Sequence, residues 1–148
     1  MKFSTLLAPL ALALLGPCTT FAAQVTYDTT YDNRAGSLTT VACSDGSNGL
    51  IPRGYKTFGD LPKFPHIGGA DVIAGWNSAS CGTCWALTYT NAQGKKTTIN
   101  VLAIDVAKSG FNIALSAMNE LTGGNAVQYG TVNVTSQKVS PSVCGLQP

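Results

Sequence analysis

The cysteines constrain this chain more than any other feature of its sequence. Five cysteines occur in 148 residues, and Cys18 lies inside an N-terminal apolar stretch that we expect to be removed. The even number that remains consists of Cys43, Cys81, Cys84 and Cys144. In an oxidising compartment these residues predict two disulfide bonds, and their spacing leaves all three pairings open.

The N-terminal stretch has the layout of a secretory signal peptide. Lys2 precedes an apolar run over 6–15, Gly16-Pro17 breaks the run, and small residues follow. The run is shorter than the roughly 20 residues that span a bilayer, which argues against a membrane anchor. We therefore predict a signal peptide over 1–22, cleaved after Ala22, and a single secreted domain over 23–148.

The segment Cys81-Gly82-Thr83-Cys84 invites two functional interpretations. A thioredoxin-type redox motif requires a helix that starts at its first cysteine, but 85–90 alternates in the manner of a strand. A zinc site requires further ligands nearby, and the single histidine, His66, stands apart from the cysteines in sequence. We therefore expect no metal and no cofactor, and cysteines that join distant segments.

Composition argues against two classes of partner. Charged residues make up 11% of the chain, with nine basic and seven acidic side chains. This is too few for the clustered Lys and Arg of a phosphate-tracking surface. We expect no nucleic acid partner, and no membrane contact once the signal peptide is removed.

Short apolar or β-branched runs alternate with turn clusters, which is typical of an all-β domain. The strongest run, 97–104, is apolar on both faces near its end, so we expect it to be a central strand. The cluster over 44–49 predicts a long turn, and 61–65 cannot be regular structure. The expected strands are 25–27, 37–43, 55–58, 71–76, 84–90, 97–104 and 131–139.

One helix is predicted, over 113–121. Ile113, Ala117 and Leu121 recur every four residues, Asn112 is a candidate N-cap, and Gly123-Gly124 would end the helix. Its apolar stripe should pack onto the sheet. The pattern as a whole therefore predicts a small β-barrel covered by one helix.

Motifs spread over the whole predicted secreted domain add a family resemblance. In order they are Asp45-Gly46, Asn48-Gly49-Leu50-Ile51, Phe64-Pro65-His66-Ile67-Gly68-Gly69, Ala74-Gly75-Trp76-Asn77-Ser78, Cys81-Gly82-Thr83-Cys84-Trp85, Asn100-Val101-Leu102-Ala103-Ile104-Asp105 and Gly110-Phe111-Asn112-Ile113-Ala114. In this order they resemble the cerato-platanins. The resemblance implies a mainly β fold, a six-stranded double-psi β-barrel with one or two short helices, as in expansins, barwin-like proteins and family-45 glycoside hydrolases. It also implies the pairings Cys43–Cys81 and Cys84–Cys144.

Asp105 is the strongest candidate for a functional carboxylate. It ends an apolar strand just before a turn, where it could open into a groove or bond the amides that follow it. The resemblance favours the groove, because cerato-platanins carry this aspartate in a carbohydrate-binding groove. Glycoside hydrolysis needs a second carboxylate, and neither Glu120, which we read as solvated, nor another acidic residue is marked as one. We therefore expect no catalytic residue and no enzyme activity.

Sugar recognition needs a planar apolar face and fixed polar groups. Two tyrosines of the first strand region lie in polar company, which predicts partial exposure, and two asparagines bracket the candidate aspartate in sequence. The predicted carbohydrate-binding residues are Asp105, Asn112, Asn100, Tyr27, Asp28 and Tyr31.

Three other side chains carry expectations of their own. Trp76 and Trp85 flank cysteines, so we expect both in the core. Asn133 begins an Asn-Val-Thr sequon, which permits glycosylation, but its place in a predicted strand disfavours the modification.

The resemblance also implies a function. It predicts a secreted protein, extracellular or in the fungal cell wall, that binds chitin or N-acetylglucosamine oligomers, with other wall polysaccharides as further candidate ligands. Plants perceive cerato-platanins as elicitors of defence, so a plant cell-surface receptor is a second candidate partner. The alternatives are expansin-like loosening of polysaccharide without hydrolysis, a surface-active self-assembling wall protein and, least favoured, a family-45-like hydrolase.

Overall fold

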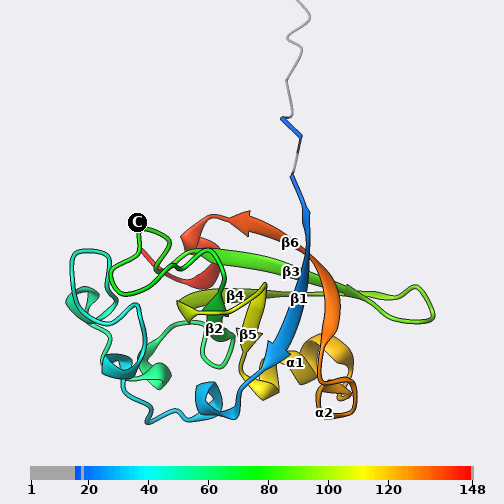
Figure 1. The fold of residues 1–148 in the computed structure, drawn as a ribbon, viewed down its shortest axis with the longest axis horizontal. Coiled ribbons are helices and arrows are strands. Elements are labelled where there is room, and N and C mark those ends of the chain that lie inside the picture. Colours follow the sequence, from blue (N-terminus) through cyan, green and yellow to red (C-terminus); the bar gives the residue numbers. More distant parts are fainter. Residues whose placement is uncertain (1–15, 18, 148) are drawn as a thin grey trace, which may run out of the picture.

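Six strands close into a barrel. The computed structural model describes residues 16, 17 and 19–147, so most of the predicted signal peptide lies outside the described residues. The strands follow the order β1-β5-β2-β4-β3-β6 around the barrel, and β6 pairs with β1 to close it (Figure 1). They are β1 (Phe21–Tyr27), β2 (Ile67–Ala70), β3 (Cys84–Thr90), β4 (Lys96–Val106), β5 (Phe111–Ile113) and β6 (Val132–Val139). The mainly β class and the six-stranded barrel are confirmed.

Parallel and antiparallel pairs alternate irregularly around this barrel. β1 runs parallel to β5 and β2 runs parallel to β4, while the other neighbours are antiparallel. Each strand has a partner on both sides, so the closed sheet offers no unpaired edge to another chain. The chain from 28 to 66, which holds four short 3-10 helices, lies beside the barrel at the left of Figure 1.

The core fills the barrel, and β4 is its central strand as expected. β4 pairs with β2 and β3, and its run Val101–Ile104 is buried without a break. β6 alternates instead, with Val132 and Val134 buried and Asn133 exposed between them. The asparagine of the sequon therefore points away from the core.

Two helices, α1 (Leu115–Thr122) and α2 (Ala126–Tyr129), follow β5. The prediction that Asn112 caps a helix starting at residue 113 is wrong, because Asn112 lies in β5. Asp32 provides the acceptor for the first turn of α1: Oδ2 accepts from the Leu115 amide at 2.8 Å and Oδ1 from the Ser116 amide at 3.0 Å. A negative charge at this end also suits the helix dipole. No helix among the described residues is long and apolar enough to cross a membrane.

Two disulfides restrain the irregular segments: one joins two loops to each other, and the other joins β3 to the 3-10 helix Pro141–Cys144. They join Cys43 to Cys81 and Cys84 to Cys144, across sequence separations of 38 and 60 residues, in the pairing that the resemblance implied. In the chain-entropy model, loops of this length gain about 4 kcal/mol of stability per bridge.

Three expected strands are absent, and their local hydrogen bonds explain why. The segment 37–43 contains a 3-10 helix (Leu38–Thr40) and a single bridge from Ser37 to Thr57. The segment 55–58 leads into another 3-10 helix (Phe58–Asp60). The segment 71–76 is a series of turns. Ser37 and Asp60 accept hydrogen bonds from nearby amides, which competes with strand pairing. Leu38 and Phe58 are nevertheless buried, so the apolar pattern marked core positions and not strands.

The sequence did not predict β2, because two of its four residues are glycines, which are rare in strands. Both glycines are needed for close packing. A Cβ on Gly68 would collide with the carbonyl oxygen of Asn112 and lie 2.6 Å from Ile113 Cα, and one on Gly69 would lie 2.5 Å from the Val106 carbonyl oxygen. β4 and β5 can therefore approach β2 only because it lacks side chains here.

We expect Gly68→Ala to lower the free energy of unfolding by about 3 kcal/mol, because the added methyl group would overpack the barrel. Gly75→Ala is the matched control, since a Cβ at Gly75 meets no atom within 4 Å, and its effect should stay within about 0.5 kcal/mol. Urea denaturation of both variants measures the difference, and equal stabilities would contradict the close approach of the strands.

Candidate functional site

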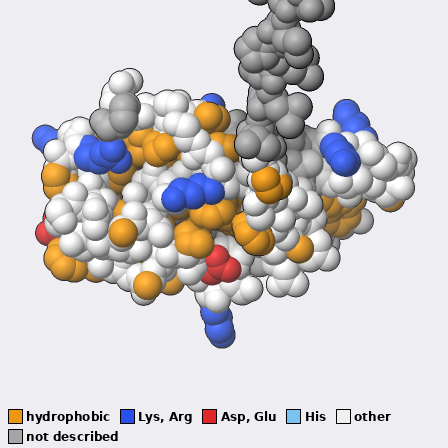
Figure 2. Space-filling model, turned by 90° about the horizontal axis from the view of Figure 1, so that it is seen from above, with side chains coloured by type: hydrophobic (Ala, Val, Ile, Leu, Met, Phe, Trp, Pro, Cys, Tyr) orange, Lys and Arg blue, Asp and Glu red, His pale blue; other side chains and the backbone are white. Residues whose placement is uncertain are grey.

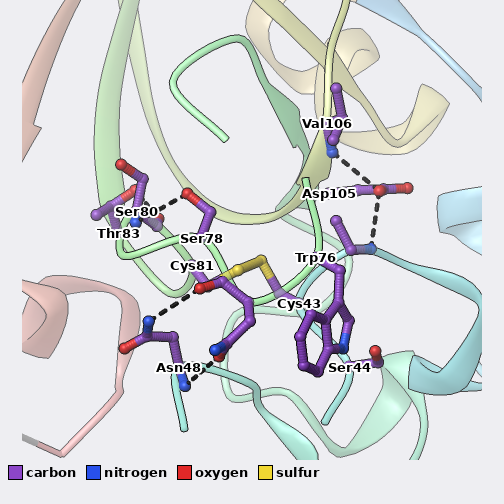
Figure 3. Close-up of a disulfide and its surroundings, with 12 residues drawn as sticks. Cys43, Ser44, Asn48, Trp76, Ser78, Ser80, Cys81, Thr83, Asp105 and Val106 are labelled. Atoms are coloured by element: carbon purple, nitrogen blue, oxygen red, sulfur yellow. Dashed lines mark hydrogen bonds between the residues drawn. A yellow bond between two sulfur atoms is a disulfide. The ribbon is translucent and has the colours of Figure 1, made fainter. Parts of the chain in front are cut away.

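Asp105 is the last residue but one of β4 and accepts three hydrogen bonds from the protein itself. Its Oδ1 accepts from the Ala42 amide at 3.0 Å and from its neighbour Val106 at 2.9 Å, and its Oδ2 accepts from the Tyr31 hydroxyl at 3.0 Å. Figure 3 shows the carboxylate beside Val106, above the loop closed by the Cys43–Cys81 disulfide. Of the two roles that the sequence left open, the bond to the following amide is therefore present. Asp105 also joins β4 to two distant loops.

Tyr31 is buried, contrary to the expectation of partial exposure. Only 5% of it is accessible, and its ring lies 6.1 Å from that of Phe58. A tyrosine can be buried at low cost when its hydroxyl has a partner, and Asp105 is that partner. Burial, followed by the negative charge of Asp105, raises the pKa of Tyr31 well above its ordinary value.

Tyr27, Asp28 and Asn112 lie close to this pair. Tyr27 is opposite Ile113 at the end of β1, and Asp28 donates its amide to the Ile113 carbonyl at 2.9 Å. The Asp28 side chain accepts from the Thr30 amide at 2.8 Å and so begins a 3-10 helix (Thr29–Asp32). Asn112 is in register with Gly69 on β2, and Gly69 is in register with Asp105 on β4. Five of the six predicted residues therefore gather at one end of the barrel.

Asn100 does not belong to this group. It pairs with Ala86 of β3 and lies five residues before Asp105, which is about 16 Å along an extended strand. Closeness in sequence is misleading here, because Asn100 lies in the middle of β4 whereas Asp105 lies near its end.

A polar hollow adjoins Asn112. It has a volume of about 420 Å³ and is lined by Gln24, Thr26, Lys108, Ser109 and Asn112. The Thr26 hydroxyl donates to Asn112 Oδ1 at 2.9 Å, which leaves the amide NH₂ of Asn112 as a donor. The hollow therefore presents hydroxyl, amide and ammonium groups from three separate segments.

A second hollow, of about 300 Å³, shares Gln24 and Ser109 with the first and extends to Asp71 and Asn133. The sequence patterns did not select Gln24, Thr26, Lys108 or Ser109. The parallel pairing of β1 with β5 brings them together, and that pairing leaves no signal in a single sequence.

Trp76 and Trp85 have different environments. Trp85 is half-buried, with its ring 5.5 Å from that of Phe111, but Trp76 is 63% exposed, so the expectation of a core position is wrong for Trp76. Its indole N–H donates to Asp45 Oδ1 at 2.6 Å, in an exposed turn. This bond is the largest cause that lowers the pKa of Asp45 below its ordinary value.

His66 has a partner that the sequence did not indicate. Its Nε2 lies 2.5 Å from Glu120 Oε2 on α1, so the pair links the loop before β2 to the helix. Glu120 is exposed to solvent, as expected, and contacts His66 as well. No group of three or more His, Cys, Asp or Glu side chains that could hold a metal occurs within the described part of the chain.

We expect Tyr31→Phe to cost about 1 kcal/mol at neutral pH, because Asp105 loses a hydrogen bond. Since the pKa of folded Tyr31 is raised, the wild type should lose stability as pH rises above about 10, where only the unfolded chain ionises this residue. Tyr31→Phe should remove that part of the loss of stability at alkaline pH.

Tyr55→Phe is the control, because the Tyr55 hydroxyl has no hydrogen-bond partner among the described residues. Urea denaturation at pH 7 and above pH 10 compares them, and an unchanged alkaline loss in Tyr31→Phe would refute the assignment.

The pKa of the Asp45 carboxylate tests its hydrogen bond to Trp76. Trp76→Phe removes the indole N–H, so the pKa of Asp45 should rise towards its ordinary value. Asp60 is the internal control, because its pKa is also lowered, but by the Thr57 and Lys56 amides. Carboxyl NMR titration reports both residues in one sample. A pKa of Asp45 that does not move would show that the bond to Trp76 is absent in solution.

Comparison with known proteins agrees with this architecture. A heat-stable 19 kDa antigen of Coccidioides posadasii is 45% identical over 152 aligned residues, covering 99% of this chain and all of the antigen. The crystal structure of cerato-platanin 2 from M. perniciosa superposes with a TM-score of 0.82 at 54% identity, covering 85% of this chain and 100% of the other. The solution structure of the fungal elicitor cerato-platanin has a TM-score of 0.69 at 39% identity, covering 82% and 95% of the two chains. The family model described as cerato-platanin matches residues 23–146, and the chain belongs to the cerato-platanin family.

Proposed function

We propose that this protein binds N-acetylglucosamine oligomers of chitin without cleaving them, at the end of the barrel where Asn112 and Asp105 lie. The observation that carries the proposal is the polar hollow lined by Gln24, Thr26, Lys108, Ser109 and Asn112. Sugar hydroxyl and acetamido groups both donate and accept hydrogen bonds. A hollow that offers amide, hydroxyl and ammonium groups on strands and a tight turn matches them.

The bonding of the carboxylates supports a role without catalysis. Asp28, Asp32, Asp60, Asp71 and Asp105 each accept a hydrogen bond from a backbone amide. These bonds engage the aspartate oxygens with the backbone of loops, turns and the first turn of α1, so the aspartates are suited to holding those segments in place. Glycoside hydrolysis instead needs two carboxyl groups that flank the scissile bond of the sugar.

Secretion and recognition by plants complete the proposal. The predicted signal peptide would export the protein, which would then act outside the cell or in the fungal wall. One structural relative is described as a fungal elicitor, and we extend that role to this chain, with a plant cell-surface receptor as partner. Infiltration of purified protein into leaf tissue tests this role, and absence of a defence response to folded protein would refute it.

Self-assembly at an interface is a weaker candidate. Of the exposed large apolar residues, Phe21 and Val72 line one hollow. On the face drawn in Figure 2, hydrophobic side chains form several groups separated by polar atoms and by isolated Lys or Arg side chains. A film-forming surface needs one contiguous apolar patch, so polysaccharide binding accounts better for this surface.

The test combines chitin binding with sugar release on one preparation. We expect the protein to bind chitin oligomers in calorimetry, and to release no reducing sugar from chitin or cellulose. Asn112→Ala should weaken binding about tenfold, because it removes amide hydrogen bonds to the sugar.

Asn100→Ala is the matched control, since it truncates the same kind of side chain at a strand position outside the site. Equal affinities of Asn112→Ala and the wild type would refute the assigned site. Sugar release that is abolished by Asp105→Asn would refute the absence of catalysis.

A further inference from the structure

Trp76 presents its ring to solvent in a fixed orientation. It is 63% exposed, and its indole N–H is already bonded to Asp45 Oδ1 at 2.6 Å. The polar edge of the ring is therefore satisfied within the protein. The apolar face of the ring is the part that remains available to a ligand.

Several independent contacts hold the loop beneath this ring. The Asn48 amide donates to Asn77 Oδ1 at 2.8 Å, and Asn48 Nδ2 donates to the Asn77 carbonyl at 2.9 Å. Asn77 has a φ of 58°, which is uncommon for a residue other than glycine. A Cβ on Gly46 would lie 3.1 Å from the Trp76 ring, so the backbone packs directly against the indole. The Cys43–Cys81 disulfide closes the base of this loop.

Polar groups belong to the same loop cluster as Trp76. A hollow of about 220 Å³ is lined by Ser47, Asn48, Arg53 and Cys81, and Asn48 is the residue that braces Asn77. The exposed aromatic face and a set of hydrogen-bonding groups therefore lie in one rigid loop cluster. A sugar ring has matching features, with C–H bonds on its faces and hydroxyl groups at its edge.

This cluster is connected to the proposed binding site through Ala42. The Ala42 amide donates to Asp105 Oδ1 at 3.0 Å, and the Ala42 carbonyl accepts from the Asn77 amide at 3.4 Å. Asp105 and Trp76 accordingly appear in the same close-up in Figure 3. The loop that carries Trp76 is therefore fixed next to Asp105 by a single intervening residue.

We propose that Trp76 is a stacking platform for one pyranose ring of a neutral wall oligosaccharide, beside the site assigned above. This inference rests on the proposed function and names a contact that the polar hollow does not supply. A membrane or protein interface would require a broad apolar patch, whereas the neighbours Asp45, Ser47 and Asn48 are exposed polar residues. The Asp45 carboxylate at the edge of the indole also disfavours acidic sugars.

The test measures affinity for chitohexaose by calorimetry in variants of the mature protein. Trp76→Ala should weaken binding about tenfold, and Trp76→Phe should weaken it less, because a smaller planar ring remains. Tyr129→Ala is the matched control, since Tyr129 is also an exposed aromatic residue, 45% accessible, on α2. Its affinity should equal that of the wild type.

Fluorescence gives a second readout that does not depend on truncating Trp76. The chain has two tryptophans, so Trp85→Phe leaves Trp76 as the only indole emitter. Saturating chitohexaose should shift its emission to shorter wavelengths, because stacking excludes water from the ring. An unchanged spectrum in a variant that binds the oligomer would overturn the platform.

The outcomes separate this inference from the proposed function. If wild-type protein binds, Asn112→Ala binds weakly and folded Trp76→Ala binds normally, the platform is refuted and the proposed function stands. If wild-type protein binds no oligomer of chitin, cellulose or β-glucan, both are refuted. Circular dichroism of each variant verifies its fold. If Trp76→Ala is unfolded, the affinity of Trp76→Phe for chitohexaose decides whether the platform exists.

Discussion

The Asp105 carboxylate holds the irregular half of this protein against its regular half. It lies near the end of the central strand of the barrel and binds the Tyr31 hydroxyl and the Ala42 amide, which belong to a segment with no strand of its own between β1 and β2. Ala42 precedes Cys43, whose disulfide is the second fastening of the same segment. A charge-assisted hydrogen bond is roughly twice as strong as a neutral one, so one side chain can position two loops on the barrel.

The same carboxylate connects stability with recognition. Asp105 has its hydrogen-bonding capacity largely taken up by the protein, so its direct contribution to a ligand is limited to what its remaining lone pairs and its charge offer. Asn112 differs, because the bond from Thr26 occupies its oxygen and leaves its NH₂ group available. In the proposed site, Asp105 would shape the surface and Asn112 would contact the ligand. Substitutions at the two positions should therefore produce different physical defects.

Sequence patterns predicted the regular part of the fold well. β3 was predicted with its observed bounds, and β4 was recognised as central, because a strand that is apolar on both faces has to be covered on both. The helix was found from its period, but its cap was misplaced, because Asp32 acts from a sequence separation of 83 residues. β2 was missed, because its glycines are selected by the closeness of β4 and β5 and not by strand preference. The sequence indicated the candidate site residues that lie near Asp105. Only the pairing of the strands shows that Gln24 and Ser109 lie at this site and that Asn100 does not.

The way in which the barrel closes has a consequence for when the protein can fold. Among the strands that the structure describes, β1 comes first and β6 last, and their pairing places Ala23 opposite Val134 and Val25 opposite Val132. β5, the other neighbour of β1, also comes from the C-terminal half of the chain. The earliest strand to emerge during synthesis therefore has no partner until most of the polypeptide has followed it. Contacts so distant in sequence form slowly, so we expect closure of the barrel to be a late step in folding.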